Sequence, residues 1–368
     1  MTVPSVDRRT AAPGDDPVVP GRPERSEPLD TFGTVLIPAT ARAAVTARRD
    51  DPPVPAARPA DSPKAAPARP SPEALRPADL LAGRRPLPRF GLPFGLRVGR
   101  GQRQDAQLAA IRTQLHQNYR VAVVSLKGGV GKTATTLALG ATLATHRSDR
   151  VITVDASPSS GTADRHGSER PRGRLAELVA ALPAMTSERD LRPFVSRTAD
   201  GLELLAHDSD PNVTAAFHEV DYRKVMRLLG REYPVILTDT GTGLLASVMR
   251  GVLDLADQVV VATTPSVDGA ITASTTLDWL AAQGYGDLVG RSVTVVTELR
   301  KAGRLIRTED VVTHFRTRCR DVVVVPFDEH LSAGAGFELD DLNARTRDAY
   351  LELAATVAAD MPRVRPTA

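Results

Sequence analysis

A glycine-rich loop between a predicted strand and a predicted helix limits the folds open to this chain more than any other feature. Residues 121–124 are apolar and mostly β-branched, which predicts a buried strand, and residues 127–133 read Lys-Gly-Gly-Val-Gly-Lys-Thr. A helical pattern begins at Lys132 and continues through Leu137 and Leu143. In this order of elements, backbone N–H groups and the positive end of the helix dipole converge on one anion. The stretch therefore predicts a phosphate-binding site.

The lysines of this loop point to a nucleoside triphosphate. Lys132 is expected to reach the β- and γ-phosphates of ATP, and Thr133 is expected to place its hydroxyl on Mg²⁺. The first glycine of the general phosphate-loop pattern is replaced by Leu126, and Lys127 follows it. Because the chain has only five lysines against 42 arginines, two lysines in one short loop indicate a need for compact ammonium charges. The residues predicted to surround the phosphates are Gly128, Gly129, Val130, Gly131, Lys132, Thr133 and Ala134.

The composition argues against several other classes of protein. The single cysteine, Cys319, excludes an internal disulfide framework and fits a reducing cytosol. No apolar run is long enough to span a membrane, and the first residues lack the apolar core of a signal peptide. A net charge of +3 permits weak attraction to DNA but does not argue for it. We therefore expect a cytoplasmic protein without a membrane span.

The N-terminal part of the chain differs from the rest. Residues 1–82 are rich in Pro, Ala and Arg, and about two-thirds of the 29 prolines fall in the first 100 residues. Such a sequence cannot bury enough apolar area to offset its chain entropy, which predicts a disordered arm. The apolar run at 32–37 is either a short docking motif for a protein partner or a chance cluster. We expect a disordered region over 1–104 and one folded domain over 105–368.

Residues 83–104 alternate arginines with leucines and phenylalanines. This pattern fits a segment that binds acidic partners, a membrane surface or nucleic acid. It fits equally a linker that packs its few hydrophobic side chains on the neighbouring domain. Three prolines in the segment argue against a membrane-surface helix. A helix is expected over 105–116.

From residue 121 onward, short apolar runs alternate with helical patterns, which predicts an α/β fold with a mostly parallel sheet of about seven strands and helices on both faces. The predicted strands are 121–126, 150–155, 202–206, 234–239, 258–263, 292–297 and 321–325. The predicted helices are 132–146, 173–198, 218–231, 243–254, 268–284, 308–319 and 343–360.

Two acids stand where predicted strands end, which is where ligands bind in parallel sheets. An acid at the end of an apolar strand is costly unless it meets a cation or hydrogen-bond donors. Asp239 is therefore expected to hold Mg²⁺, Asp155 to assist at the same ion, and Gly241 to let the backbone approach the γ-phosphate. The alternative for each acid is a helix cap or turn. After the fifth strand, Asp268 is expected to cap the next helix, with Ser266 as the other candidate.

These motifs together resemble a known class of ATPases. Residues 127–133 are similar to the deviant Walker A motif of the MinD/ParA class of P-loop ATPases, and segments 155–158, 239–241 and 263–265 resemble its switch I, switch II and fifth-strand exit. The resemblance covers about residues 118–360. The N-terminal arm and the residues that follow the predicted strands narrow the resemblance to the actinobacterial MinD-like, EspI-like ATPases associated with type VII secretion.

The resemblance implies a homodimer in which two nucleotides are sandwiched between the subunits. Carried over, Lys127 would cross to the partner's phosphates while Lys132 serves its own. Two triphosphates that face each other need extra positive charge at the interface. A protein partner, possibly the secretion machinery, would bind through the arm.

Three positions depart from the pattern of this class. A water-positioning acid is usual where Ser157 stands, which implies slow hydrolysis, so Asp155 and Ser157 are the switch residues expected to bear on catalysis. Ala134 lacks the hydroxyl that often contacts the α-phosphate. Thr297 or Glu298 stands in place of the base-reading Asn, although Pro326 and Phe327 remain candidates for walls of the base site.

Three functions stay open at this point. The first is an ATP-dependent dimerising switch that regulates or positions a larger machine, with weak ATPase activity. The second is a ParA-like positioning ATPase bound to DNA without sequence preference, which salt-dependent retention on DNA would reveal. The third is a pseudo-ATPase scaffold that binds nucleotide without turnover, which any Lys132-dependent hydrolysis would exclude.

Overall fold

The computed structural model describes residues 100–157, 173–185, 187–207, 217–241, 247–298, 306–333 and 338–362. The predicted N-terminal arm, its apolar run at 32–37 and nearly all of the 83–104 segment lie outside these residues. The domain boundary at residue 104 therefore stays a prediction. The switch segments continue outside the described residues at 158 and at 242.

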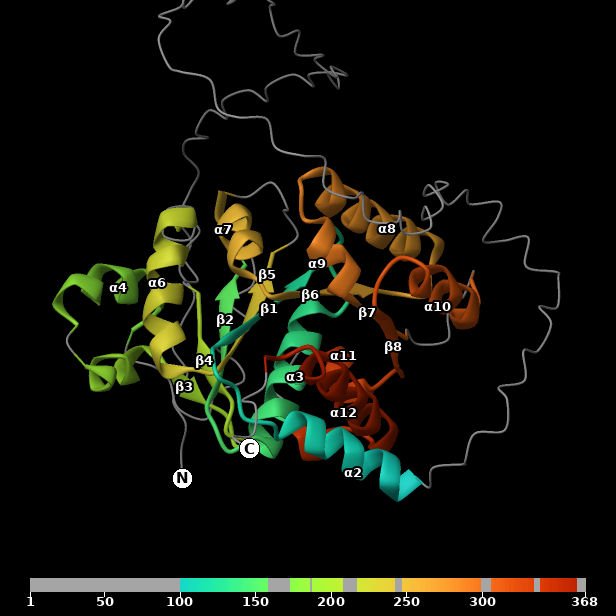
Figure 1. Ribbon diagram of the computed structural model, residues 1–368, viewed down its shortest axis with the longest axis horizontal. Coiled ribbons are helices and arrows are strands. Elements are labelled where there is room, and N and C mark those ends of the chain that lie inside the picture. Colours follow the sequence, from blue (N-terminus) through green and yellow to red (C-terminus); the bar gives the residue numbers. More distant parts are fainter. Residues whose placement is uncertain are drawn as a thin grey trace, which may run out of the picture. The chain divides into compact units, whose positions relative to one another are not determined.

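Within the described residues, eight strands form one sheet in the order β3-β4-β2-β5-β1-β6-β7-β8 (Figure 1). All neighbours are parallel except the short pair β3 and β4. The predicted mostly parallel α/β sheet is confirmed, and β3 is the strand that the sequence pattern did not reveal. The strands are β1 (Tyr119–Val124), β2 (Val151–Ala156), β3 (Ser196–Arg197), β4 (Glu203–Leu205), β5 (Val235–Thr240), β6 (Gln258–Thr263), β7 (Val293–Thr297) and β8 (Asp321–Val325).

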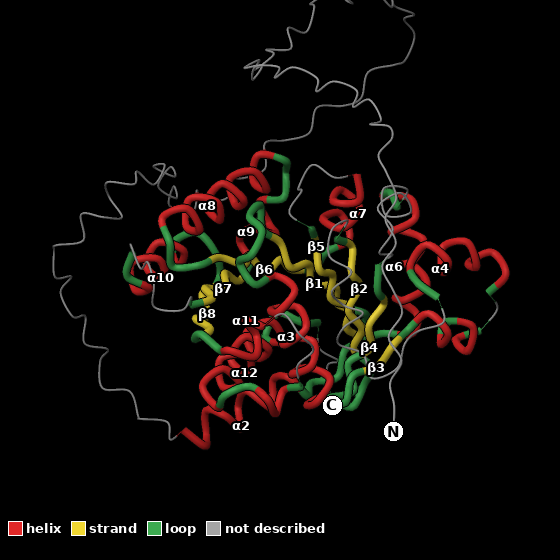
Figure 2. The backbone as a smooth tube through the Cα atoms, turned by 180° about the vertical axis from the view of Figure 1, so that it is seen from behind, coloured by secondary structure: helices red, strands yellow, loops and turns green. Residues whose placement is uncertain are grey.

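Helices cover both faces of this sheet, and the two face layers are visible in Figures 1 and 2. One face carries α2 (Arg100–Ile111), α3 (Lys132–His146) and α12 (Ala344–Ala358). The other face carries α4 (Leu175–Ala181), α6 (Glu219–Glu232), α7 (Ser247–Leu255), α8 (Val267–Ala282), α9 (Gly286–Arg291) and α10 (Thr308–Arg316). A short helix, α11 (Glu329–Ala333), follows β8.

The alternation of side chains along β1 shows why the sheet needs both layers. Val121 and Val123 pack with α3 and α12, whereas Ala122 and Val124 pack with the opposite helices. Successive side chains of a strand point to opposite faces, so an apolar run must be covered twice. The continuous valine and isoleucine runs therefore account for a three-layer fold.

Two predicted helices differ from the structure. The stretch 173–198 is not one helix but α4, three short 3-10 turns and β3, because Pro183 and Pro193 cannot continue an α-helix and instead start 3-10 turns. The helix before β1 runs from Arg100 to Ile111 rather than over 105–116. Its last carbonyl, on Ile111, accepts a hydrogen bond from the buried Arg147 guanidinium, which explains the early end.

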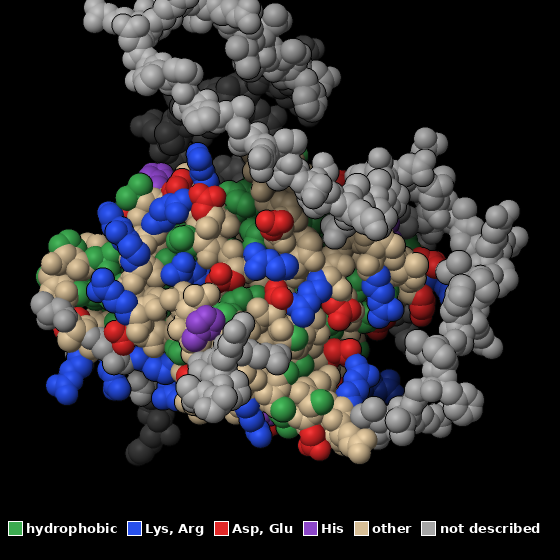
Figure 3. All heavy atoms as spheres, in the orientation of Figure 1, with side chains coloured by type: hydrophobic (Ala, Val, Ile, Leu, Met, Phe, Trp, Pro, Cys, Tyr) green, Lys and Arg blue, Asp and Glu red, His purple; other side chains and the backbone are tan. Residues whose placement is uncertain are grey.

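The described surface is mixed in charge. On the face shown in Figure 3, Lys and Arg side chains are spread over the molecule with Asp and Glu side chains between them. Among the described residues, none of the helices combines the length and apolar character that a membrane span requires.

Gly269 in the first turn of α8 provides a test of the packing around the end of β6. A Cβ atom on Gly269 would lie 2.7 Å from the Thr264 carbonyl oxygen, which is backbone and cannot swing away. We expect Gly269→Ala to lower the free energy of unfolding by about 1–3 kcal/mol despite the better helix propensity of alanine. Denaturant unfolding followed by circular dichroism measures this change.

The matched control is Gly290→Ala in α9, where a Cβ would meet no atom within 4 Å. This variant should leave stability unchanged or raise it by about 0.4–1 kcal/mol through the lower entropy of the unfolded chain. Equal destabilisation by the two substitutions would contradict the packing argument.

Candidate functional site

The loop between β1 and α3 follows the last residue of β1, so it lies at the carboxyl edge of the sheet. β1 is a central strand between β5 and β6. Gly129 and Gly131 adopt left-handed backbone conformations with φ of 73° and 86°. Gly131 is also the N-cap of α3, and a Cβ there would lie 3.3 Å from Thr297 Oγ1. Glycine permits both the conformation and the close approach. The loop is thus shaped as the sequence predicts for an anion cradle.

Lys132 is the first residue of α3, and its side chain folds over the loop. It is 8 % exposed, and its Nζ donates a hydrogen bond of 3.1 Å to the carbonyl oxygen of Lys127. Burial lowers the pKa of Lys132, while the nearby Asp239 carboxylate acts in the opposite direction. A cation held in a partly dry loop interacts with an anion more strongly than one in water.

Thr133 and Asp239 meet beside this lysine. Thr133 Oγ1 donates a 2.6 Å hydrogen bond to Asp239 Oδ2, and Asp239 is 3 % exposed at the end of β5. The other carboxylate oxygen, Oδ1, has no hydrogen-bond partner in the described part of the chain. Burial raises the pKa of Asp239 to about 6, although Thr133 and Lys132 act to lower it. A hydroxyl and an incompletely bonded carboxylate side by side are the oxygen ligands that Mg²⁺ accepts.

Asp155 lies next to Asp239 because their strands pair in register at these two residues. It is 2 % exposed at the end of β2, and its Oδ1 accepts a 2.9 Å hydrogen bond from the backbone N–H of Ser157. The structure therefore brings both predicted acids and Ser157 to the same corner.

The predicted second lysine is engaged within its own chain. Lys127 Nζ forms an ion pair with the carboxylate of Asp268 in the first turn of α8. The expectation that Asp268 caps α8 is therefore wrong: the Ser266 hydroxyl accepts the capping hydrogen bond from Gly269 N at 3.0 Å. Sequence reasoning missed the Lys127 partner, although β6 pairs with β1 and so carries α8 toward the loop.

The remaining predicted residues form two groups, one at the ends of β7 and β8 and one at the end of β5. Thr297 lies against Gly131 and pairs in register with Val325, so Pro326 and Phe327 follow directly beside it. Gly241 is buried next to Thr240, and the Thr240 hydroxyl donates to the carbonyl of Val123 at 2.8 Å. These contacts bring both groups to the carboxyl edge that carries the loop.

The residues that build this site also fall within a known domain family. A family model described as the CobQ/CobB/MinD/ParA nucleotide binding domain matches residues 121–335, which contain the loop, both acids and Thr297. The chain belongs to this family. The predicted membership of the MinD/ParA class is confirmed.

Individual relatives support the same assignment. The chain is 37% identical over 258 residues to the ESX-1 secretion-associated protein EspI of Mycobacterium tuberculosis strains H37Rv and CDC 1551, an alignment that covers 69% of this chain. It spans 38% of the length of those relatives.

Solved structures show the same fold. A ParA family ATPase from Chlorobium tepidum superposes with a TM-score of 0.54 at 18% identity, and the cell division ATPase MinD from Pyrococcus furiosus with 0.53 at 19%. Each alignment covers 65% of this chain and 98% of the other.

The raised pKa of Asp239 predicts a stability change with pH. In the folded, nucleotide-free protein this carboxyl holds its proton up to about pH 6, whereas its ordinary pKa is 3.8, so stability falls as pH rises from about 4 to 6. The difference corresponds to at most about 3 kcal/mol. Asp239→Asn should therefore raise the free energy of unfolding at pH 7 by about 1–3 kcal/mol, with a gain that shrinks toward pH 4.

Asp328 is a control of opposite sign for the same unfolding experiment. It accepts hydrogen bonds from His330 N and from the backbone and side chain of Asn343. Burial acts to raise the pKa of Asp328, but these hydrogen bonds outweigh it and lower the pKa. Asp328→Asn should destabilise the protein at neutral pH, with a loss that shrinks in acid. Changes of the same sign in the two variants would contradict the assigned charge states.

Proposed function

We propose that this chain is a cytoplasmic ATP-binding switch that dimerises on binding ATP and Mg²⁺, hydrolyses ATP slowly, and regulates or positions a larger machine. The observation that carries the proposal is the group formed by the buried Lys132 and Asp239 and the half-buried Thr133. It stands beside a loop whose Gly129 and Gly131 adopt left-handed conformations.

The residues present fit a Mg²⁺-nucleotide. Backbone N–H groups of residues 128–134 and the ammonium group of Lys132 would hold the phosphates. Thr133 and Asp239 would hold the metal, with Asp155 next to them; the unbonded Oδ1 of Asp239 is the atom that such an ion would satisfy. When bound, Mg²⁺ supplies positive charge that stabilises charge on the phosphate oxygens.

We expect slow hydrolysis of ATP because of the side chain that would stand next to the phosphates, Ser157. The hydroxyl of Ser157 can orient a water molecule but is a poor base, and Asp155 already accepts the Ser157 N–H. Residues of this kind favour a long-lived ATP-bound state over rapid turnover.

We propose that the larger machine is a secretion system. EspI, which is 37% identical to this chain over the aligned residues, carries the description of an ESX-1 secretion-associated protein. We propose the same kind of role here, with the proline-rich N-terminal region as the part that contacts the protein partner. The mixed charge of the face in Figure 3 does not favour DNA as the main partner.

Dimerisation is tested through the two partners of the ion pair. We expect Lys127→Ala to abolish ATP-dependent dimerisation, because it removes the charge proposed to cross to the partner subunit. Asp268→Asn keeps Lys127 but removes the acid that holds it in its own chain, so dimers should form at about two- to fivefold lower ATP concentration. Sedimentation velocity with ATP and Mg²⁺ measures both effects.

Lys224→Ala serves as the matched control, since Lys224 is an exposed lysine paired with Asp221 on α6, away from the loop. It should dimerise as the unchanged protein does. A protein that stays monomeric with ATP and Mg²⁺, and in which Lys127→Ala has no effect, would refute the dimerising switch.

Turnover is tested at Ser157. Ser157→Asp introduces a carboxylate beside Asp155, and we expect steady-state phosphate release to rise about tenfold or more. Ser157→Asn, of similar size without the charge, should give no gain, and Lys132→Ala should remove all hydrolysis. If neither the unchanged protein nor Ser157→Asp releases phosphate above the Lys132→Ala level, the chain is a nucleotide-binding scaffold instead.

A further inference from the structure

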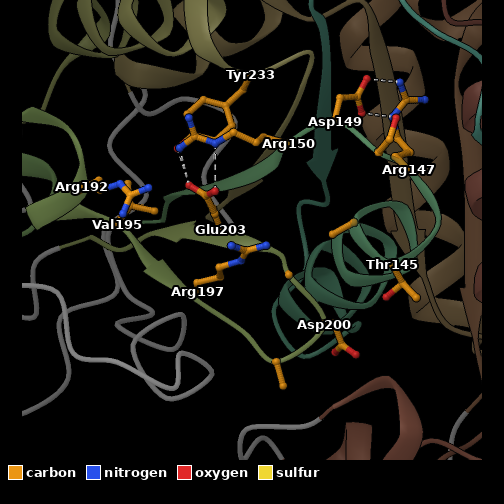
Figure 4. A pocket seen from close by; sticks show the side chains of 14 residues that line it. Thr145, Arg147, Asp149, Arg150, Arg192, Val195, Arg197, Asp200, Glu203 and Tyr233 are labelled. Carbon is orange, nitrogen blue, oxygen red and sulfur yellow. Dashed lines mark hydrogen bonds and ion pairs between the residues drawn. The ribbon is translucent and has the colours of Figure 1, made fainter. Parts of the chain in front are cut away.

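A second cavity lies at the opposite edge of the sheet. It has a volume of about 840 Å³, and its walls come from the end of α3, the loop before β2, the 3-10 turn before β3, the β3–β4 hairpin and the C-cap of α6 (Figure 4). Arg150 lies just before β2 at this edge, whereas Asp155 ends the same strand at the nucleotide edge. At about 3.3 Å per residue the two edges are roughly 16 Å apart along the strand.

Part of the cavity wall is a rigid network of charged and aromatic groups. Arg150 donates two hydrogen bonds to the Glu203 carboxylate, at 3.0 and 2.9 Å, and its guanidinium carbon lies 4.4 Å from the centre of the Tyr233 ring. The Tyr233 hydroxyl donates to the same carboxylate at 2.6 Å. Burial acts to raise the pKa of Glu203, but these hydrogen bonds and Arg150 lower it overall, so this acid stays charged and holds Arg150 in place.

A second ion pair, between Arg147 and Asp149, forms another part of the cavity wall. Arg147 has a side chain that is 2 % exposed, and it donates to both oxygens of Asp149 at 2.7 and 2.6 Å. The two acids Asp149 and Glu203 are thus matched by the two arginines Arg147 and Arg150.

Two further arginines line the same cavity. Arg192 lies on the 3-10 turn before β3, and in the described part of the chain it makes no ion pair; Arg197 lies on β3. In Figure 4 the Arg197 guanidinium lies near the Glu203 carboxylate, and Arg192 lies next to Val195. Both residues are exposed, and Arg197 also interacts electrostatically with the Glu203 carboxylate.

Asp200 is the remaining acid in the wall. Burial raises the pKa of Asp200, and Asp340 and Asp341 act in the same direction, against a hydrogen bond from Leu339 N that lowers it. The lining as a whole holds four arginines against three acids, Asp149, Asp200 and Glu203. The end of α3 contributes partial negative charge on the other side.

We propose that this cavity binds a small organic polyanion with phosphate or carboxylate groups, held by Arg192 and Arg197. Guanidinium groups bind planar or tetrahedral oxyanions with paired hydrogen bonds, and the volume falls in the range of small-molecule sites. The Arg150–Glu203–Tyr233 network supplies the fixed wall. This site is separate from the nucleotide edge and does not rest on the proposed ATP function.

The test is calorimetric titration of the full chain with pyrophosphate and, separately, with citrate, at constant ionic strength. Both titrations use the Lys132→Ala variant, because the loop after β1 is itself expected to bind phosphates. We expect saturable binding of at least one anion, weakened about tenfold or more by Arg192→Gln together with Arg197→Gln. Binding of pyrophosphate alone assigns phosphate chemistry, and binding of citrate alone assigns carboxylate chemistry.

Arg316→Gln is the matched control, since Arg316 is an exposed arginine of α10 outside the cavity. It should leave binding unchanged. The proposal is overturned if neither anion binds saturably, or if the Arg192 and Arg197 variants bind as well as the control. The single variants replace the double one if circular dichroism shows that the double variant does not fold.

Discussion

The hydrogen bond between Thr133 and Asp239 is the contact on which the arrangement of the site depends. It joins the first turn of α3 to the end of β5, and through the β1–β5 and β2–β5 registers it fixes where the loop and Asp155 lie. A buried carboxylate is costly without full pairing, and one oxygen of Asp239 lacks a partner in the described chain. The fold thus keeps a destabilising group where a metal ion would stabilise it.

The two lysines of the loop have different surroundings. In the proposed switch, Lys132 would therefore serve nucleotide binding and Lys127 would serve dimer assembly. Lys132 is buried against the loop it serves, so its position is set before any ligand arrives. Lys127 is more exposed and is held by Asp268 from the neighbouring α8. An exposed ion pair contributes about 0.2–1 kcal/mol, which is small enough for a second subunit to replace it.

The two edges of the sheet carry different kinds of side chain. The carboxyl edge holds the buried Lys132, Asp155 and Asp239 beside the glycine-rich loop, whereas the amino edge holds four arginines and three acids around an open cavity. β2 joins the edges, with Arg150 before it and Asp155 at its end. Most of the sheet therefore separates two proposed anion sites, one built on backbone N–H groups and one on guanidinium groups.

The sequence by itself determined the parallel sheet, the position of the glycine-rich loop and both strand-end acids, because apolar runs, glycines and the residues that end strands are local signals. The helix α3 begins and ends where its sequence pattern predicts. The tertiary structure decided that Ser266 caps α8 while Asp268 pairs with Lys127, and that Pro183 and Pro193 divide the stretch before β3. It also decided that arginines from separate segments share one cavity, since which segments become neighbours depends on long-range packing.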